Sequence, residues 1–145
     1  MNKEKIRKRL PIVLTFIIIA GASIFVYFGY REPKVTISPA SFNVNTFSSW
    51  NITIPIEEIA NIDTISWNEM PRISFRSNGI SLFGVHRGWF KTKDGNTIWL
   101  SIKSGVTPVI QIAEKNGQLY YMNRTNTKET LDIFNKLSCL MENKE

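Results

Sequence analysis

Residues 88–102 read GWFKTKDGNTIWLSI. Asp94-Gly95 supplies the positive φ angles that a type I′ turn requires, so the flanking residues are expected to form a β-hairpin. After the turn, Ile98, Leu100 and Ile102 occupy alternate positions, and Trp99 falls on the opposite face. This alternation is typical of a strand with one buried face. The stretch therefore predicts two antiparallel strands, over 88–92 and 97–102.

Two further turn signals, Asn78-Gly79 and Asn116-Gly117, lie on either side of this hairpin. Three hairpins in succession predict an antiparallel meander. The expected strands of this region are 72–76, 80–85, 88–92, 97–102, 108–113 and 119–123. Upstream, 34–37, 41–44, 50–54 and 62–67 also alternate, and 56–60 is expected to form a single helical turn.

The period changes near the end of the chain. Leu131, Phe134, Leu137 and Met141 follow one another at helical spacing, and Asn126 precedes them as a helix N-cap. The pattern predicts an amphipathic helix over about 127–142. The soluble part is therefore expected to be mainly β with one C-terminal helix, as a small antiparallel barrel or sandwich capped by that helix.

The basic charge lies at the N-terminus. The whole chain carries a formal net charge of +6, but residues 1–31 contain six basic residues against Glu4 alone. The other 114 residues are close to neutral. Because a nucleic-acid-binding domain needs its basic excess on the folded part, this distribution argues against nucleic acid as a partner.

Residues 12–30, IVLTFIIIAGASIFVYFGY, contain no charged residue. A helix of this length spans about 28 Å, which matches the hydrocarbon core of a bilayer. The basic residues before it place the N-terminus in the cytoplasm by the positive-inside rule. The expected organisation is a cytoplasmic basic tail (1–11), a transmembrane helix (12–30) that contacts the lipid bilayer, a linker (31–34) and an extracytoplasmic domain (35–142).

A cleaved secretory signal is the alternative interpretation, because Ala20-Gly21-Ala22 fits a cleavage site. The protein would then be an exported soluble barrel, released by cleavage near Ala22, that binds a small ligand. The apolar run continues past this site to Phe28, whereas a signal peptide becomes polar around its cleavage point. An uncleaved anchor is therefore the favoured interpretation.

The candidate partner surface combines basic residues of the middle hairpins with one tryptophan. Basic side chains in this region could meet phosphates or an acidic partner, although charges that protect strand edges from aggregation are the favoured explanation. Trp99, opposite the apolar stripe, is expected either at a binding surface or under the C-terminal helix. The candidate residues are Arg72, Arg76, Arg87, Lys91 and Trp99.

The sequence gives little indication of catalysis. His86 is the single histidine and Cys139 the single cysteine, too few soft ligands for a zinc or iron–sulfur site. His86 is expected to be a polar loop residue, with a pH-responsive or ligand-contacting role as the alternative. We expect no catalytic residue, metal or cofactor.

The order of these elements resembles the bacterial pleckstrin-homology-like (PH-like) domains over about residues 35–140. The stretches that carry the resemblance are Ile65-Ser-Trp67, Gly84, Gly88-Trp-Phe-Lys91, Asp94-Gly95, Val109-Ile-Gln-Ile112 and Tyr120-Tyr121. The resemblance implies a seven-stranded, partly open barrel closed by the C-terminal helix, tied to a membrane helix and without catalysis. The expected function is a membrane-anchored binding or scaffolding domain for a protein partner or envelope component.

Overall fold

The computed structural model describes residues 3–46 and 48–143, with side chains from Arg9 onward except at Ser48. The chain divides into two compact units, Met1–Arg31 and Glu32–Glu145. Of the basic tail expected at 1–11, residues 1–2 and the side chains of residues 3–8 lie outside the described part.

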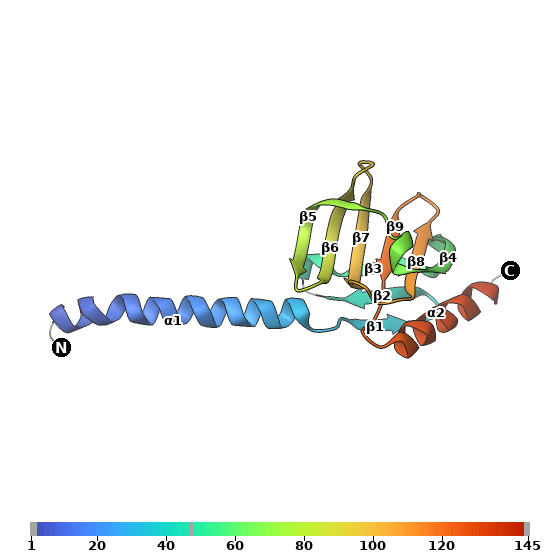
Figure 1. Cartoon of the computed structure of the whole chain (residues 1–145). Coiled ribbons are helices and arrows are strands. Elements are labelled where there is room, and N and C mark those ends of the chain that lie inside the picture. The colour runs from blue at the N-terminus through green and yellow to red at the C-terminus, as the bar shows by residue number, and fades with distance from the viewer. Residues whose placement is uncertain (1–2, 47, 144–145) are drawn as a thin grey trace. The chain divides into compact units, whose positions relative to one another are not determined.

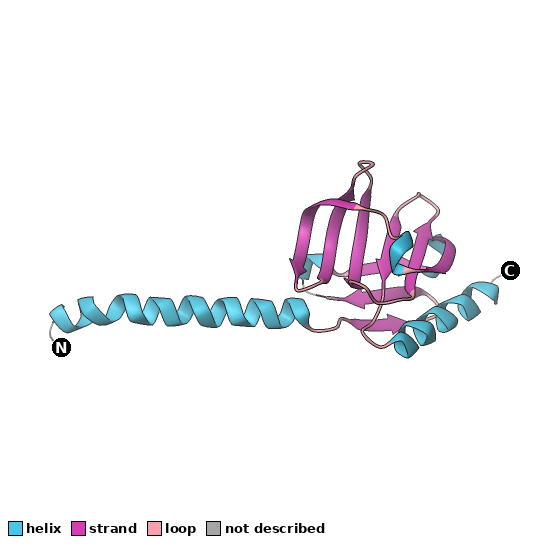
Figure 2. Ribbon diagram, viewed as in Figure 1, coloured by secondary structure: helices cyan, strands magenta, loops and turns pink. Residues whose placement is uncertain are grey.

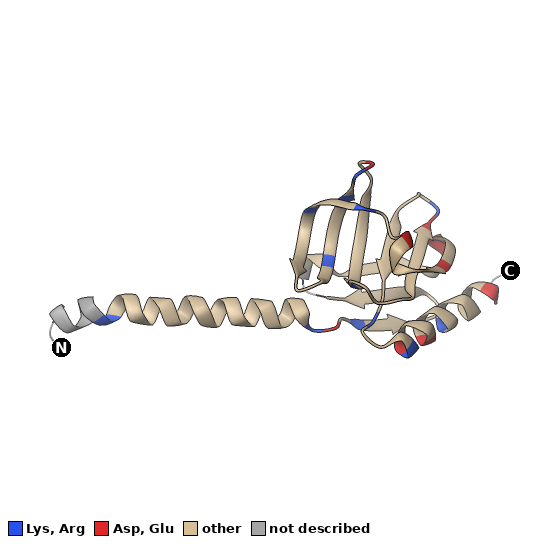
Figure 3. Ribbon diagram, in the orientation of Figure 1, with Lys and Arg blue, Asp and Glu red and all other residues tan. Residues whose placement is uncertain are grey.

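The first unit contains the helix α1 (Lys3–Tyr30), shown in blue in Figure 1. Figure 3 shows no charged residue along it between Arg9 and its end. The segment Arg9–Tyr30 is long and apolar enough to cross a membrane, a property that signal sequences share. This agrees with the apolar span expected at 12–30.

The second unit is mainly β, as the sequence predicts. Its strands are β1 (Lys34–Ile37), β2 (Ser41–Asn45), β3 (Ile52–Pro55), β4 (Ile59–Ile65), β5 (Ile73–Leu82), β6 (Val85–Thr92), β7 (Thr97–Lys103), β8 (Val109–Glu114) and β9 (Leu119–Met122). Three short 3-10 helices, η1 (Ser48–Trp50), η2 (Ile56–Glu58) and η3 (Trp67–Glu69), and the helix α2 (Thr127–Glu142) complete it. α2 has the predicted bounds, and η2 confirms the helical turn expected at 56–60.

The strands form two sheets (Figure 2). β1, β2 and β3 make an antiparallel three-stranded sheet, while the other six strands lie in the order β4-β8-β9-β7-β6-β5. Side chains from both sheets share one buried core. The sheets do not close into a barrel, so of the two expected forms, barrel or sandwich, the structure has the layered one.

The middle of the six-stranded sheet is not an antiparallel meander. β7 and β9 pair in parallel, with Trp99 opposite Tyr120, whereas the other neighbouring strands of the sheet are antiparallel. After β7, residues 104–108 lead to β8, which is not adjacent to β7 in the sheet. The chain then turns at Asn116-Gly117, and β9 occupies the position between β8 and β7. The meander prediction failed here because a turn fixes only the pairing of the strands that it joins.

Asn78-Gly79 is not a turn, in contrast to the prediction. Both residues lie inside β5, which joins most of the strand expected at 72–76 to the first three residues of the strand expected at 80–85. Gly79 lies opposite Gly88 of β6, and a Cβ on Gly79 would approach the Arg87 carbonyl oxygen to 2.2 Å. Glycine serves here to let two backbones come close, and the β5–β6 turn falls at Phe83-Gly84.

Two buried clusters lie on the two faces of the six-stranded sheet. The first joins the sheets to α2, and its buried members are Phe42, Val44, Ile52, Ile54, Ile56, Ile59, Trp99, Ile110, Ile112, Tyr120, Met122 and Leu137. The second contains Phe90, Ile98, Leu100, Ile102, Val109 and Tyr121, against which Trp67 and Met70 pack. β7 contributes to both clusters, so it is buried on both faces rather than on one.

α2 begins at its predicted cap. The Asn126 side chain accepts a hydrogen bond of 2.9 Å from the Lys128 amide, and Leu137 is fully buried in the first cluster. Ile133, Phe134, Leu140 and Met141 pack against the same cluster. The helix thus adds its apolar face to the core that the two sheets share.

Candidate functional site

The five residues expected at a partner surface do not form one exposed patch. Arg72 and Arg76 are exposed and Lys91 is half-buried, whereas Arg87 and Trp99 are buried. Arg76 of β5 pairs with Phe90 of β6, so these two side chains share a face of the sheet. Lys91 follows Phe90 on β6 and therefore points to the opposite face. The sequence does not show the register between adjacent strands, so it cannot show which of these residues share a face of the sheet.

Trp99 is part of the core. Its side chain is fully buried, and its indole N–H donates a hydrogen bond of 3.0 Å to the carbonyl oxygen of Trp50. The Tyr120 ring lies 6.2 Å away, centroid to centroid. Of the two alternatives for Trp99, a binding surface is therefore wrong, and the Trp50 segment joins α2 in covering this face.

Arg87 is a buried cation near the start of the second unit. Its side chain is 6% exposed and lies on the face of β6 that packs against the first cluster, between Ile80 and Ser101 of the flanking strands. Its charge is one of the influences that lower the pKa of Glu32. Arg87 therefore acts within the domain rather than on an exposed partner surface.

Glu32 and Arg124 fasten the entry of the chain to the domain. The Glu32 carboxylate accepts a 2.7 Å hydrogen bond from the Thr125 amide and lies 3.4 Å from Arg124 Nε. Arg124 also contacts Glu129 at 3.3 Å and donates to the Pro33 carbonyl oxygen. Partial burial alone would raise the pKa of Glu32, but the Thr125 hydrogen bonds and the charges of Arg124 and Arg87 outweigh it and lower that pKa.

The sequence analysis missed this ion-pair network. Glu32 and Arg124 are separated by about ninety positions, and neither residue belongs to a recognisable motif. No local pattern connects the two residues, so only the three-dimensional structure brings them together.

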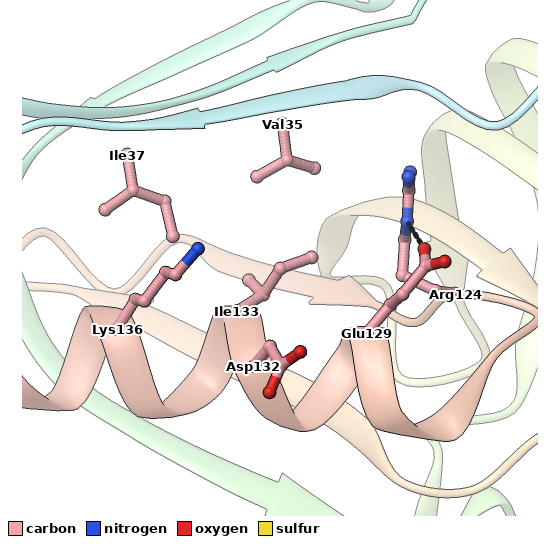
Figure 4. Close-up of a pocket in the computed structure, with 7 residues that line it drawn as sticks. All are labelled: Val35, Ile37, Arg124, Glu129, Asp132, Ile133 and Lys136. Atoms are coloured by element: carbon pink, nitrogen blue, oxygen red, sulfur yellow. Dashed lines mark hydrogen bonds and ion pairs between the residues drawn. The ribbon is translucent and has the colours of Figure 1, made fainter.

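A groove lies between β1 and α2 (Figure 4). It has two adjoining cavities of about 320 and 310 Å³ that share Ile37 and Lys136. The first is lined by Val35, Ile37, Arg124, Glu129, Asp132, Ile133 and Lys136, and the second by Ile37, Ser38, Pro39, Lys136, Cys139 and Leu140. The groove thus combines an apolar floor with charged side chains of α2 and Arg124.

The strand on one side of this groove is a sheet edge. β1 pairs with β2 alone in the order β1-β2-β3. The Ser38 amide bonds the Ser41 carbonyl oxygen at 3.0 Å, and hydrogen-bonded pairs alternate along an antiparallel ladder. The backbone groups of Val35 and Ile37 therefore point away from β2, toward the free edge. An extended polypeptide beside β1 could pair with these groups.

His86 links three segments of the domain. Its Nδ1 lies 2.8 Å from the Ser81 hydroxyl and its Nε2 lies 3.0 Å from the Ser104 hydroxyl. Burial lowers the pKa of His86, which favours the neutral ring at pH 7. His86 is a half-buried strand residue rather than the expected loop residue, and the partners of both ring nitrogens are hydroxyl groups.

No group of three His, Cys, Asp or Glu side chains that could hold a metal ion occurs among the described residues. The chain matches no known family model, no curated protein and no solved structure. Three features of the molecule itself bear on its function: the apolar helix, the open groove and the charged network at the start of the domain.

Proposed function

We propose that the chain is a single-pass membrane protein that displays a non-catalytic, PH-like binding domain on the extracytoplasmic side of a bacterial membrane. One observation carries this proposal. A helix long and apolar enough to cross a membrane ends at Tyr30, and a compact domain begins at Glu32. A bilayer would hold the helix, and the domain would meet a protein or envelope component.

The β1–α2 groove is the proposed partner site. It offers a free strand edge, an apolar floor and charged residues at one wall, which together suit an extended segment of a protein partner. The arrangement of an apolar helix, a β domain and a C-terminal helix is compatible with the PH-like resemblance. The open sheets and the parallel β7–β9 pair depart from the barrel that the resemblance implies.

Cys139 allows the topology to be tested without adding a cysteine. It is the single cysteine of the chain and is exposed on α2. In intact cells, a maleimide reagent that cannot cross the cytoplasmic membrane should label the full-length protein, which should remain in the membrane fraction after a carbonate wash. Labelling that requires permeabilised cells would instead place the domain in the cytoplasm and overturn the proposed orientation.

Two variants serve as controls. Cys139→Ser should abolish labelling, while Lys5→Cys in that background should label only after permeabilisation. The mass of the purified protein separates the alternative interpretation from the anchor. A soluble species that has lost about the first 22 residues by cleavage after Ala22 would support release by a signal peptidase and contradict a membrane anchor.

A further inference from the structure

Several loops meet at the end of the domain where the chain enters. β5 ends and β6 begins there, at the Phe83-Gly84 turn, and β7 ends there at Lys103. β9 runs parallel to β7, so it ends at the same edge and leads into Asn123 and Arg124. This end of the domain, formed by the β5–β6 turn, the β7–β8 loop and the β9–α2 loop, is called the entry end.

A series of polar contacts connects the Phe83 turn to Glu32. Lys103 Nζ donates a hydrogen bond of 2.9 Å to the Phe83 carbonyl oxygen, and the Lys103 amide donates one of 2.7 Å to Asn123 Oδ1. Asn123 precedes Arg124, which pairs with Glu32. Glu32 therefore belongs to the entry end and is fastened there by its carboxylate.

The link between Glu32 and α1 is short. Only Arg31 separates Glu32 from the last helical residue, Tyr30, so the two Cα atoms on either side of Arg31 can be at most about 7 Å apart. If α1 spans a bilayer with Tyr30 at the interface, this short link keeps Glu32, and the loops to which it is fastened, within reach of the lipid surface. The opposite end, at the Asp94-Gly95 turn, lies a β6 length away, or about 26 Å.

Phe83 stands out at the entry end. Its side chain is 74% exposed, more than any other large hydrophobic residue of the described side chains, those of α1 included. Its backbone has a φ of +49°, a left-handed conformation that is unfavourable for an aromatic residue. A phenylalanine that combines a left-handed backbone with a largely solvated ring suggests a role at a surface that supplies an apolar environment.

The charge around Phe83 suits a lipid headgroup region. Residues 79–93 and 95–113 contain no Asp or Glu, so β5–β7 present no carboxylate near the turn. The Lys103 ammonium is held against the Phe83 carbonyl. An exposed aromatic ring beside a cation is the combination by which surface segments enter the headgroup and acyl boundary of a membrane.

We propose that the Phe83-Gly84 turn inserts the Phe83 ring into the membrane interface and holds the domain against the lipid surface. The inference rests on the proposed function, because it requires α1 to lie in the bilayer. Phe83 would then be a second lipid contact, separate from the helix. The β1–α2 groove, whose cavities contain no residue of this turn, would stay available to a protein partner.

The test uses the full-length chain reconstituted into vesicles of phosphatidylethanolamine and phosphatidylglycerol. In a Cys139→Ser background, Phe83→Cys carries an environment-sensitive fluorophore, and Asp94→Cys carries the same dye at the opposite exposed turn. Lipids with a spin label just below the headgroup should quench the dye at position 83 at least about twofold, and its emission should shift to the blue. The dye at position 94 should show neither effect.

Three outcomes can be distinguished. If the protein does not co-sediment with vesicles after a carbonate wash, the membrane anchor itself fails. If it co-sediments but the dye at position 83 remains solvent-exposed, the anchor stands and the Phe83 contact is overturned. A blue shift at position 83 without quenching by the lipid would mean that the turn docks on protein, which also overturns it. Equal thermal unfolding midpoints for both labelled variants and their parent would exclude misfolding as the cause.

Discussion

At Gly88, both the backbone conformation and the close approach of β5 leave no room for a side chain. It has a φ of +110°, and a Cβ placed there would lie 2.3 Å from the Asn78 carbonyl oxygen. Gly95 also has a positive φ, of +86°, but nothing lies within 4 Å of its Cβ position. A side chain at Gly95 would therefore cost only the strained backbone conformation, whereas one at Gly88 would also clash with the neighbouring strand.

We expect Gly88→Ala to destabilise the domain by about 2–4 kcal/mol, because positive φ and a clash between strands both contribute. Gly95→Ala should cost only about 1 kcal/mol, from the conformation alone. Urea unfolding of the full-length protein in detergent micelles measures both changes. Equal losses for the two variants would contradict a close approach of β5 and β6 at Gly88.

Three Asn-Gly or Asp-Gly dipeptides show what a local sequence signal can and cannot predict. Asp94-Gly95 and Asn116-Gly117 lie at turns as predicted, and in each case the strands that they join pair with each other. The predicted type I′ geometry is wrong, because only the glycine of each pair has a positive φ. Asn78-Gly79 has the same composition but lies in the middle of β5. The difference arises from the neighbouring Gly88, a contact between strands that no dipeptide signal contains.

The attachment of the segment between α1 and β1 to the domain depends on the charge of Glu32. Its folded-state pKa lies below its ordinary value of 4.5, so the folded state binds fewer protons than the unfolded state in that range. The stabilisation is thus complete above pH 4.5 and is lost as the pH falls through the folded-state pKa.

Glu32→Gln should cost about 1 kcal/mol at pH 7, because the carboxylate is partly exposed and its ion pair is partly screened. The difference in unfolding free energy between this variant and the wild type should shrink as the pH falls below 4.5. Glu57→Gln, at an exposed position of η2, is the matched control and should change stability by less than about 0.5 kcal/mol. A pH-independent difference for Glu32→Gln would rule out the ionised carboxylate as the cause.

β1 is the element that makes the groove a candidate binding site. The amides of Val35 and Ile37 point toward the free edge, while the Thr36 amide faces β2, where Thr36 pairs with Asn43. In hydrogen exchange resolved by residue, Val35 and Ile37 should exchange at least about tenfold faster than Thr36 in the free protein. A partner that adds a strand to β1 should slow both. Equal protection of Ile37 and Thr36 would mean that the edge is already occupied.

For the whole molecule, local signals predicted the elements better than their arrangement. The mainly β composition and the bounds of α2 follow from alternation, turn residues and helical spacing, all of which act over a few positions. The two separate sheets depend on pairings such as β4 with β8, between residues about fifty positions apart. Periodicity carries no information about such partners, so the sequence alone could not decide between a barrel and a sandwich.

The candidate site shows the same limit. The basic residues and Trp99 were selected by type, but burial depends on which sheet covers them, and Trp99 lies beneath the Trp50 segment. The groove and the Glu32–Arg124 pair join the start of the domain to its last helix. The residues of the groove and of the ion pair belong to no recognisable sequence motif. They come together only because the chain returns from β9 into α2 beside the start of the domain.

The position of β9 also bears on the order in which the domain can be made. β9 is inserted between β7 and β8, both of which are synthesised earlier, and it supplies the link between the two halves of the six-stranded sheet. Until residues 119–122 have emerged, the β4–β8 pair and the β5–β6–β7 meander are not joined by a strand. The domain therefore completes its fold only when nearly all of it has left the ribosome.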